Sequence, residues 1–219
     1  MTRRLLALAL LASTAASAAP DLSGTWWIKD RSGIAAVDPA AIPFTPAARA
    51  TFDRNRAAAA IPPKERDCLP EGTPRLMLAP YPLQILQRPE QVTMLFEREH
   101  MVRFVPIDQP LPADPDPTYL GSSVGRWTGD ALTVDTIGFN DITLIDRTGI
   151  PHSDAMRLSE RLSLRDGGAT LHDEVTVTDA KSFTRPWTFA IDFARATGVR
   201  LMEDVCTFGP PQRDTMDRK

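Results

Sequence analysis

Strict alternation of apolar and polar residues constrains this chain more than any other feature, because a period of two is the pattern of a half-buried β-strand. The alternation is clearest from Arg157 to Thr178, where two such runs flank the turn sequence Asp166-Gly167-Gly168. We predict a β-hairpin over this segment. Keeping the leucines on one face sets its register, with Leu164 opposite Leu171.

Other segments share the alternation and predict further strands. A Gly-X turn at Gly129-Asp130 folds Ser122 to Ile137 into a second hairpin, in which Trp127 faces Leu132 and Arg126 faces Thr133. Many short antiparallel strands with almost no amphipathic helix predict an all-β closed barrel or strongly curved sheet. The remaining predicted strands are the segment that starts at Asp21-Leu-Ser-Gly-Thr-Trp-Trp, Gln91 to Val105, Phe183 to Phe193, and Val199 to Val205.

The predicted domain organisation is a single domain at 19–208. Its first part, 19–89, holds the first strand, a short helix and a wrapped segment with seven prolines between Ile61 and Pro89. The helix is expected from Thr45 to Ala60, because Thr45 can cap it and Pro46 suits its first position. The β-barrel core is placed at 90–208 and a flexible tail at 209–219.

The N-terminus predicts export. Arg3 and Arg4, the apolar run Leu5 to Ala12 and the small residues Ala16-Ser17-Ala18 form the pattern of a secretory signal peptide at 1–18, cleaved near Ala18. We therefore expect a periplasmic or secreted protein without membrane insertion. Loss of the two arginines shifts the formal charge from −3 to −5, which disfavours nucleic acid or an anionic membrane surface as a partner.

The predicted export determines what is expected of the two cysteines. In an oxidising environment, Cys68 and Cys206 are expected to form one disulfide that joins an early loop to the C-terminal segment.

Charged residues fall in rows that should face the core. Glu160 lies in the row of Leu158, Leu162 and Leu164, and the hairpin register brings Asp173 beside it as a diagonal neighbour. Buried charges must pair with one another or line a wet cavity, unless a bulge or a one-residue slip places them in solvent. The charged members of apolar rows are Arg98, His100, Glu160, Asp173, Arg185 and Glu203.

His152 and His100 are the candidate bases. His152 lies in the loop that leads into the strand of Glu160, and His100 is expected to point inward, whereas His172 is expected to be exposed. Either base, with Glu160 or Asp173 as acid or orienting carboxylate, suits general acid–base chemistry. In the alternative, His152 only bonds a backbone carbonyl of its turn.

The other candidate site residues would bind a ligand. Arg98 or Arg185 would hold an anionic group, Trp127 and Trp187 would contact a ring, and Glu203 would complete a cavity of mixed charge. No metal-ligand spacing, G-x-S-x-G, GxGxxG or P-loop sequence occurs, so we expect neither a metal nor a cofactor.

Two resemblances add to these predictions. Gly24-Thr25-Trp26 resembles the Gly-x-Trp motif of lipocalins and related calycin barrels, which implies an antiparallel lipocalin-like barrel. The chain also resembles a group of secreted bacterial proteins of uncertain function, from which it departs at Thr128 and Leu144. The shared blocks are PYPLQILQRPEQV (Pro80 to Val92), GRWTGDALTVDTIGFND (Gly125 to Asp141), PHSDAMRLSER (Pro151 to Arg161) and RPWT (Arg185 to Thr188).

Three functions are compatible with the sequence. The first is an exported small-molecule-binding barrel for a ring-bearing polar organic ligand. The second is a cofactor-free lyase, isomerase or hydrolase that uses the same cavity for general acid–base chemistry. The third is an envelope structural protein whose internal charges form ion pairs and leave no cavity.

Overall fold

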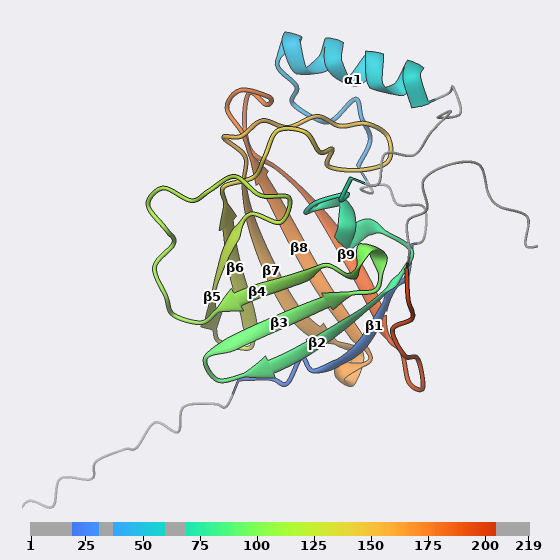
Figure 1. Cartoon of the computed structure of the whole chain (residues 1–219), viewed down its shortest axis with the longest axis vertical. Helices are drawn as coiled ribbons and strands as arrows, with labels where there is room; N and C mark the ends of the chain where they lie inside the picture. The colour runs from blue at the N-terminus through green and yellow to red at the C-terminus, as the bar shows by residue number, and fades with distance from the viewer. Residues whose placement is uncertain (1–18, 31–36, 60–68, 205–219) are drawn as a thin grey trace, which may run out of the picture.

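The protein is an all-β antiparallel barrel with one α-helix in the part of the chain that the computed structural model describes, residues 19–30, 37–59 and 69–204 (Figure 1). The prediction of a lipocalin-like barrel is confirmed. In the described residues, nine strands form one sheet in the order β4-β3-β2-β1-β9-β8-β7-β6-β5. They are β1 (Gly24–Ile28), β2 (Pro82–Arg88), β3 (Gln91–Phe96), β4 (Val102–Pro106), β5 (Ser122–Thr128), β6 (Ala131–Ile137), β7 (Arg157–Arg165), β8 (Thr170–Thr178) and β9 (Trp187–Arg195).

Both hairpins predicted from turn sequences have the predicted register. In β7–β8, Leu164 pairs with Leu171 and Leu162 with Asp173, around the 3-10 turn η3 (Asp166–Gly168). In β5–β6, Trp127 pairs with Leu132, and Gly129 takes a positive φ of 64° in the turn. Because residue pairing in a sheet fixes which face each side chain occupies, these registers place Glu160 and Asp173 inside the barrel.

A seam between the edge strands β4 and β5 interrupts the barrel wall. Each pair of adjacent strands in the sheet is antiparallel, so β4 and β5 run parallel and meet in one isolated bridge between Ile107 and Gly125. The N–H of Asp108 donates to the carbonyl of Gly125 at 2.8 Å. A Cβ on Gly125 would lie 2.9 Å from both Ile107 Cδ1 and Val105 Cγ1, so glycine allows this close approach.

Tryptophan and arginine close the barrel end where β1 begins. Trp26 is fully buried, and its indole N–H donates to the carbonyl of Leu22 at 2.9 Å. The Arg195 guanidinium lies 4.2 Å from the centroid of the Trp26 ring and donates to the carbonyl of Ser23 at 2.8 Å. These contacts tie β9 to the segment that precedes β1, and a cation over an indole face is a favourable arrangement.

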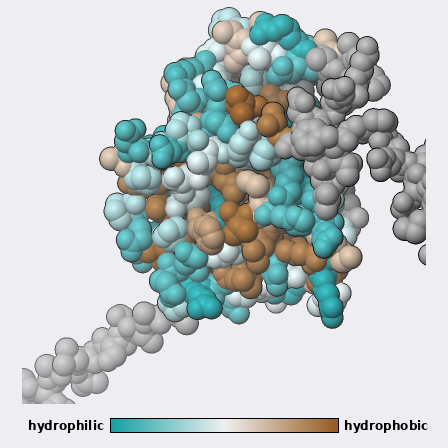
Figure 2. Space-filling model, viewed as in Figure 1, coloured by the Kyte–Doolittle hydropathy of each residue, from teal (hydrophilic) through white to brown (hydrophobic). Residues whose placement is uncertain are grey.

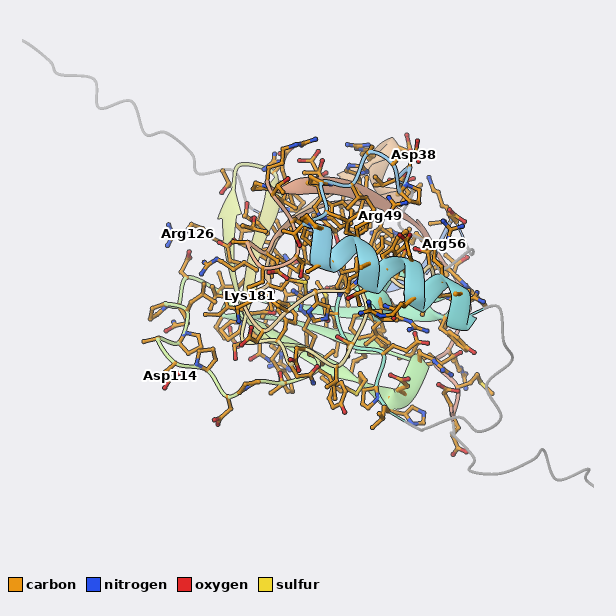
Figure 3. All side chains as sticks on the ribbon, turned by 90° about the horizontal axis from the view of Figure 1, so that it is seen from above. Asp38, Arg49, Arg56, Asp114, Arg126 and Lys181 are labelled. Carbon is orange, nitrogen blue, oxygen red and sulfur yellow. The ribbon has the colours of Figure 1, made fainter. Side chains whose placement is uncertain are left out.

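The helix α1 (Pro46–Ala59) lies across the opposite end of the barrel, as the view from above shows (Figure 3). Thr45 caps it, since its hydroxyl accepts the N–H of Ala48 at 3.3 Å and donates to the Lys181 carbonyl at 3.1 Å. Phe52 is buried and stacks on Phe44 with the ring centroids 5.1 Å apart. The helix therefore acts as a cover rather than as a separate unit.

The long strand predicted from Gln91 to Val105 is wrong, because two strands and a turn occupy this segment. Residues Glu99 and His100 have positive φ angles of 60° and 50° within the 3-10 turn η2 (Arg98–His100), and the chain reverses there. The turn shifts the inward row by one residue, so Arg103 and Val105 are buried while Val102 and Phe104 are 37% and 57% exposed.

Three further expectations are corrected. The segment expected to be irregular up to Pro89 contains the 3-10 helix η1 (Arg75–Leu78) and the strand β2, which pairs with β1 and β3. The strand predicted from Phe183 begins only at Trp187. The described residues 199–204 form no strand. The strand β2 forms despite the prolines on either side of it, because it hydrogen-bonds to both β1 and β3.

Several predictions concern residues outside the described ranges. The signal peptide at 1–18, the tail at 209–219 and both Cys68 and Cys206 belong to these parts of the chain. Among the described residues, no helix has the length and hydropathy needed to cross a membrane.

We predict that Thr45→Ala lowers the free energy of unfolding by about 1 kcal/mol, because it removes the N-terminal cap of α1. Thr45→Ser keeps a hydroxyl at this position and should retain most of the stability. Urea unfolding followed by circular dichroism measures both variants. Equal losses in the two variants would contradict a role for the capping hydroxyl.

Candidate functional site

Five inward polar side chains on neighbouring strands form one buried group, here called the inner polar cluster. Its members are Arg103 on β4, Ser123 on β5, Thr136 on β6, Glu160 on β7 and Asp173 on β8. Each is exposed by no more than 7%. Arg103 comes from one edge of the sheet and Ser123 from the other, so the cluster spans the seam.

Arg103 is the centre of the cluster. Its guanidinium makes a bidentate ion pair with Glu160, with Nη1 at 2.9 Å from Oε1 and Nη2 against Oε2. Its Nε donates to the Ser123 hydroxyl at 2.9 Å, and Nη2 also donates to the Thr136 hydroxyl at 2.7 Å. Arg103 therefore connects β4 to β5, β6 and β7 by side-chain hydrogen bonds where the backbone provides only the bridge at Gly125.

Glu160 keeps Arg103 charged inside the barrel. Burial lowers the pKa of Arg103, but the charge and hydrogen bonds of Glu160 raise it by more, so the net shift is upward. A planar guanidinium matches a carboxylate in two parallel hydrogen bonds, which is the arrangement that best compensates the loss of hydration. The charged residue that the sequence placed in a leucine row thus belongs to a buried ion pair.

Asp173 is the member of the cluster without a bonded partner. It is fully buried, and neither carboxyl oxygen has a hydrogen-bond partner in the structure. Burial raises its pKa well above the usual value and the nearby Glu160 raises it further, while Arg103 opposes the shift. An isolated charge here would be costly, so the carboxyl group is held in its neutral form well above the pH at which an exposed Asp ionises.

A pocket of about 550 Å³ lies at the seam between β4 and β5. Its floor includes the buried Arg103 and Ser123, and its rim includes the exposed Val102 and Phe104. Hydrophobic side chains are visible on the face of the barrel that carries β3 and β4 (Figure 2). The pocket is lined by Met101, Val102, Arg103, Phe104, Pro106, Gln109, Pro110, Pro112, Thr118, Tyr119, Leu120, Gly121, Ser122, Ser123 and Val124.

His152 is bonded into its own loop. Its Nδ1 bonds the carbonyl of Ser153 at 3.1 Å, and its Nε2 bonds the hydroxyl of Thr143 at 2.7 Å. Burial lowers its pKa, against opposing effects of the Ser153 carbonyl, Asp179 and Asp141. Both ring nitrogens therefore have partners other than Glu160 and Asp173, as in the alternative that the sequence left open.

Asp179 holds the loop that carries His152. Its carboxylate accepts the N–H and the hydroxyl of Ser153 at 2.7 and 2.8 Å, and the N–H of Lys181 at 3.0 Å. Burial raises the pKa of Asp179, but the hydrogen bonds from Ser153 outweigh it and leave the pKa lowered. The segment Pro151–Ser153 is thus fastened to the connection between β8 and β9.

Arg98 and His100 lie in the η2 turn instead of the inward row. Arg98 pairs with Asp204 at 3.3 Å and Glu71 at 3.6 Å, and the ring of Tyr81 lies under its guanidinium. His100 is exposed, and its Nε2 accepts the N–H of Asp204 at 3.0 Å. Their predicted inward placement is wrong, because the chain reverses at this turn.

The remaining predicted ligand-binding residues are also dispersed. Arg185 precedes β9 and is exposed, and Glu203 is exposed outside any strand, so neither faces the lumen. Trp127 packs partly buried against the core on β5. Trp187 is buried on β9 among Phe183 and Phe189, with ring centroids 5.4 and 5.6 Å away.

His172 is buried on β8, although its position in a polar row predicted exposure. Its Nδ1 bonds the carboxylate of Asp192 on β9 at 2.7 Å. The pair joins two strands side by side, which is the ordinary role of a cross-strand polar contact.

The structure therefore brings together Glu160 and Asp173 and adds Arg103, Ser123 and Thr136, which the sequence reading missed. The buried position of Glu160 could have predicted that Arg103 faces inward. A buried Glu160 requires a cation, and shifting β4 by one residue moves Arg103 inward while leaving Val105 as its apolar neighbour in the row.

Among residues 19–30, 37–59 and 69–204, no group of three or more His, Cys, Asp or Glu side chains could hold a metal ion. Comparison with known proteins found no family model and no curated protein that matches the chain. The chain is similar to a solved structure titled "REP1-NXSQ fatty acid transporter", at 13% identity and a TM-score of 0.39. That match covers 80% of this chain and 96% of the other.

We predict that Arg103→Met lowers the free energy of unfolding by about 3–5 kcal/mol, because it leaves Glu160 buried without a partner. The double variant Arg103→Met/Glu160→Leu should regain most of this loss, since apolar residues can replace a buried ion pair at little cost. A double-mutant cycle by guanidinium unfolding measures the coupling. Additive effects of the two substitutions would rule out the ion pair as the source of the loss.

We predict that Asp173→Asn changes how stability depends on pH. The folded state holds the Asp173 proton more tightly than the unfolded chain, so the wild type loses stability as pH rises from about 4 towards the folded pKa. The variant lacks this loss. Its free energy of unfolding should therefore rise relative to that of the wild type between pH 4 and pH 8. Thermal unfolding across this range checks the shift, with the exposed Glu90→Gln as control. A constant difference between wild type and Asp173→Asn would count against the prediction.

Proposed function

We propose that this protein is an exported small-molecule-binding barrel whose ligand occupies the pocket at the β4–β5 seam. The observation that carries the proposal is the pocket itself, a cavity of about 550 Å³ that starts between exposed apolar side chains and ends on buried polar ones. Pockets of this size with a mostly apolar lining and a few fixed polar groups are typical of small-ligand sites. Export rests on the signal-peptide pattern at 1–18.

The lining favours a ligand with a ring and a polar group. Phe104 and Tyr119 offer aromatic surface, and Met101 offers an adaptable thioether side chain. Gln109, Thr118 and Ser122 offer hydrogen-bonding groups in the same lining. This combination supports the ring-bearing polar ligand expected from the sequence, at a place different from the centre of the lumen.

The contacts of the other candidate residues favour binding over the two alternatives. His152 and His100 are bonded away from Glu160 and Asp173, so no histidine–carboxylate pair for acid–base chemistry is assembled among these residues. The Arg103–Glu160 pair agrees with the structural alternative, but that alternative also requires a barrel without a cavity.

We predict that the uncharged fluorophore N-phenyl-1-naphthylamine binds the protein, and that Phe104→Ala weakens its binding about tenfold by removing aromatic contact surface at the rim. Ile142→Ala is the matched control, because Ile142 is 62% exposed and does not line the pocket. Fluorescence titration gives both dissociation constants. Native mass spectrometry of protein purified from the exporting cell would identify a ligand that remains bound.

The proposal fails if wild-type protein binds no fluorophore and carries no small molecule. It also fails if Phe104→Ala and Ile142→Ala weaken binding equally, since the loss would then have no connection with the seam.

A further inference from the structure

Among the described residues that line the seam pocket, Arg103 is the single charged one. An arginine at the end of an apolar pocket commonly holds an anionic group, because its planar fork matches a carboxylate or phosphate. Whether Arg103 can do so depends on how many of its donors are free.

A guanidinium has five N–H donors, and each of those on Arg103 has an acceptor within the protein. The Nε donor reaches Ser123 at 2.9 Å. Nη1 bonds Glu160 at 2.9 Å and the sulfur of Met77 at 3.6 Å, and Nη2 bonds Glu160 and the Thr136 hydroxyl. No donor is left for a ligand without displacing one of these partners.

The positive charge of Arg103 is also compensated within the protein. Glu160 neutralises it at direct contact, whereas the raised pKa of Asp173 on the next strand keeps that carboxyl group uncharged. An anion that enters the pocket would give up its hydration and find neither a free donor nor an uncompensated positive charge.

We propose that Glu160 is the specificity-determining residue of the seam pocket, which by occupying Arg103 makes the pocket select uncharged ligands over carboxylates and sulfonates. The inference rests on the proposed function of the pocket and names the class of ligand. Glu160 acts through Arg103 without lining the pocket, so it is a positioning residue that sets which donors a ligand can reach.

Two probes with one ring system test the selectivity. N-phenyl-1-naphthylamine is uncharged at neutral pH, and 1-anilinonaphthalene-8-sulfonate carries the same rings with an added sulfonate. We expect the wild type to bind the uncharged probe at least tenfold more tightly than the sulfonate. Glu160→Gln should free the charge of Arg103 and raise the affinity for the sulfonate relative to the uncharged probe at least tenfold.

Two further variants keep the test decisive if Glu160→Gln does not fold. Thr136→Val frees one N–H of Arg103 and retains the ion pair, so it should improve sulfonate binding by a smaller factor. Glu174→Gln removes an exposed carboxylate from the neighbouring position to Asp173 and should leave the ratio of the two affinities unchanged. Circular dichroism establishes that each variant is folded.

The outcomes separate this inference from the proposed function. If the wild type binds neither probe, the ligand-binding function fails and the selectivity fails with it. If it binds both probes equally well, the pocket binds ligands but Glu160 does not set their charge. If folded Glu160→Gln and Thr136→Val both keep the wild-type ratio, the selectivity has another source and the role of Glu160 is refuted.

Discussion

The bidentate ion pair between Arg103 and Glu160 is the interaction on which the closure of this barrel depends. Within the ranges that the structure describes, every other neighbouring pair of strands is joined by a backbone ladder, but β4 and β5 share only the bridge between Ile107 and Gly125. Arg103 crosses that seam and bonds side chains on β5, β6 and β7. Because both charges are buried, the loss of either one would weaken the wall and leave the other uncompensated.

The same interaction links the fold to the pocket. Arg103 and Ser123 hold the two edges together and also form the floor of the cavity. The groups that a ligand would meet at that floor are therefore already engaged in holding the barrel closed. Asp173 differs from them, since its oxygens have no partner and its raised pKa keeps it neutral. The side chains that join the two edges of the barrel are thus the same ones that form the floor of the pocket.

Sequence reasoning predicted the parts of the fold that local chemistry determines. The Asp-Gly-Gly and Gly-Asp turns fix the registers of β7–β8 and β5–β6, so the burial of Glu160 and Asp173 could be predicted. The turn at η2 contains no glycine, proline or asparagine, although Glu99 and His100 adopt positive φ angles there. Without that signal the alternation predicts one continuous strand with Arg98 and His100 in its inward row, and in that register Arg103, the partner of Glu160, falls on the opposite face.

The number of strands explains why the two strands at the seam run parallel. In a closed ring of strands whose neighbours all run antiparallel, directions alternate, and only an even number can return to the start without a mismatch. The described part of this chain supplies nine, so the first and last strands in the sheet must run the same way. The two edges beside the pocket therefore meet in parallel, through the bridge between Ile107 and Gly125, and one more strand would have allowed the antiparallel pattern to continue across the seam.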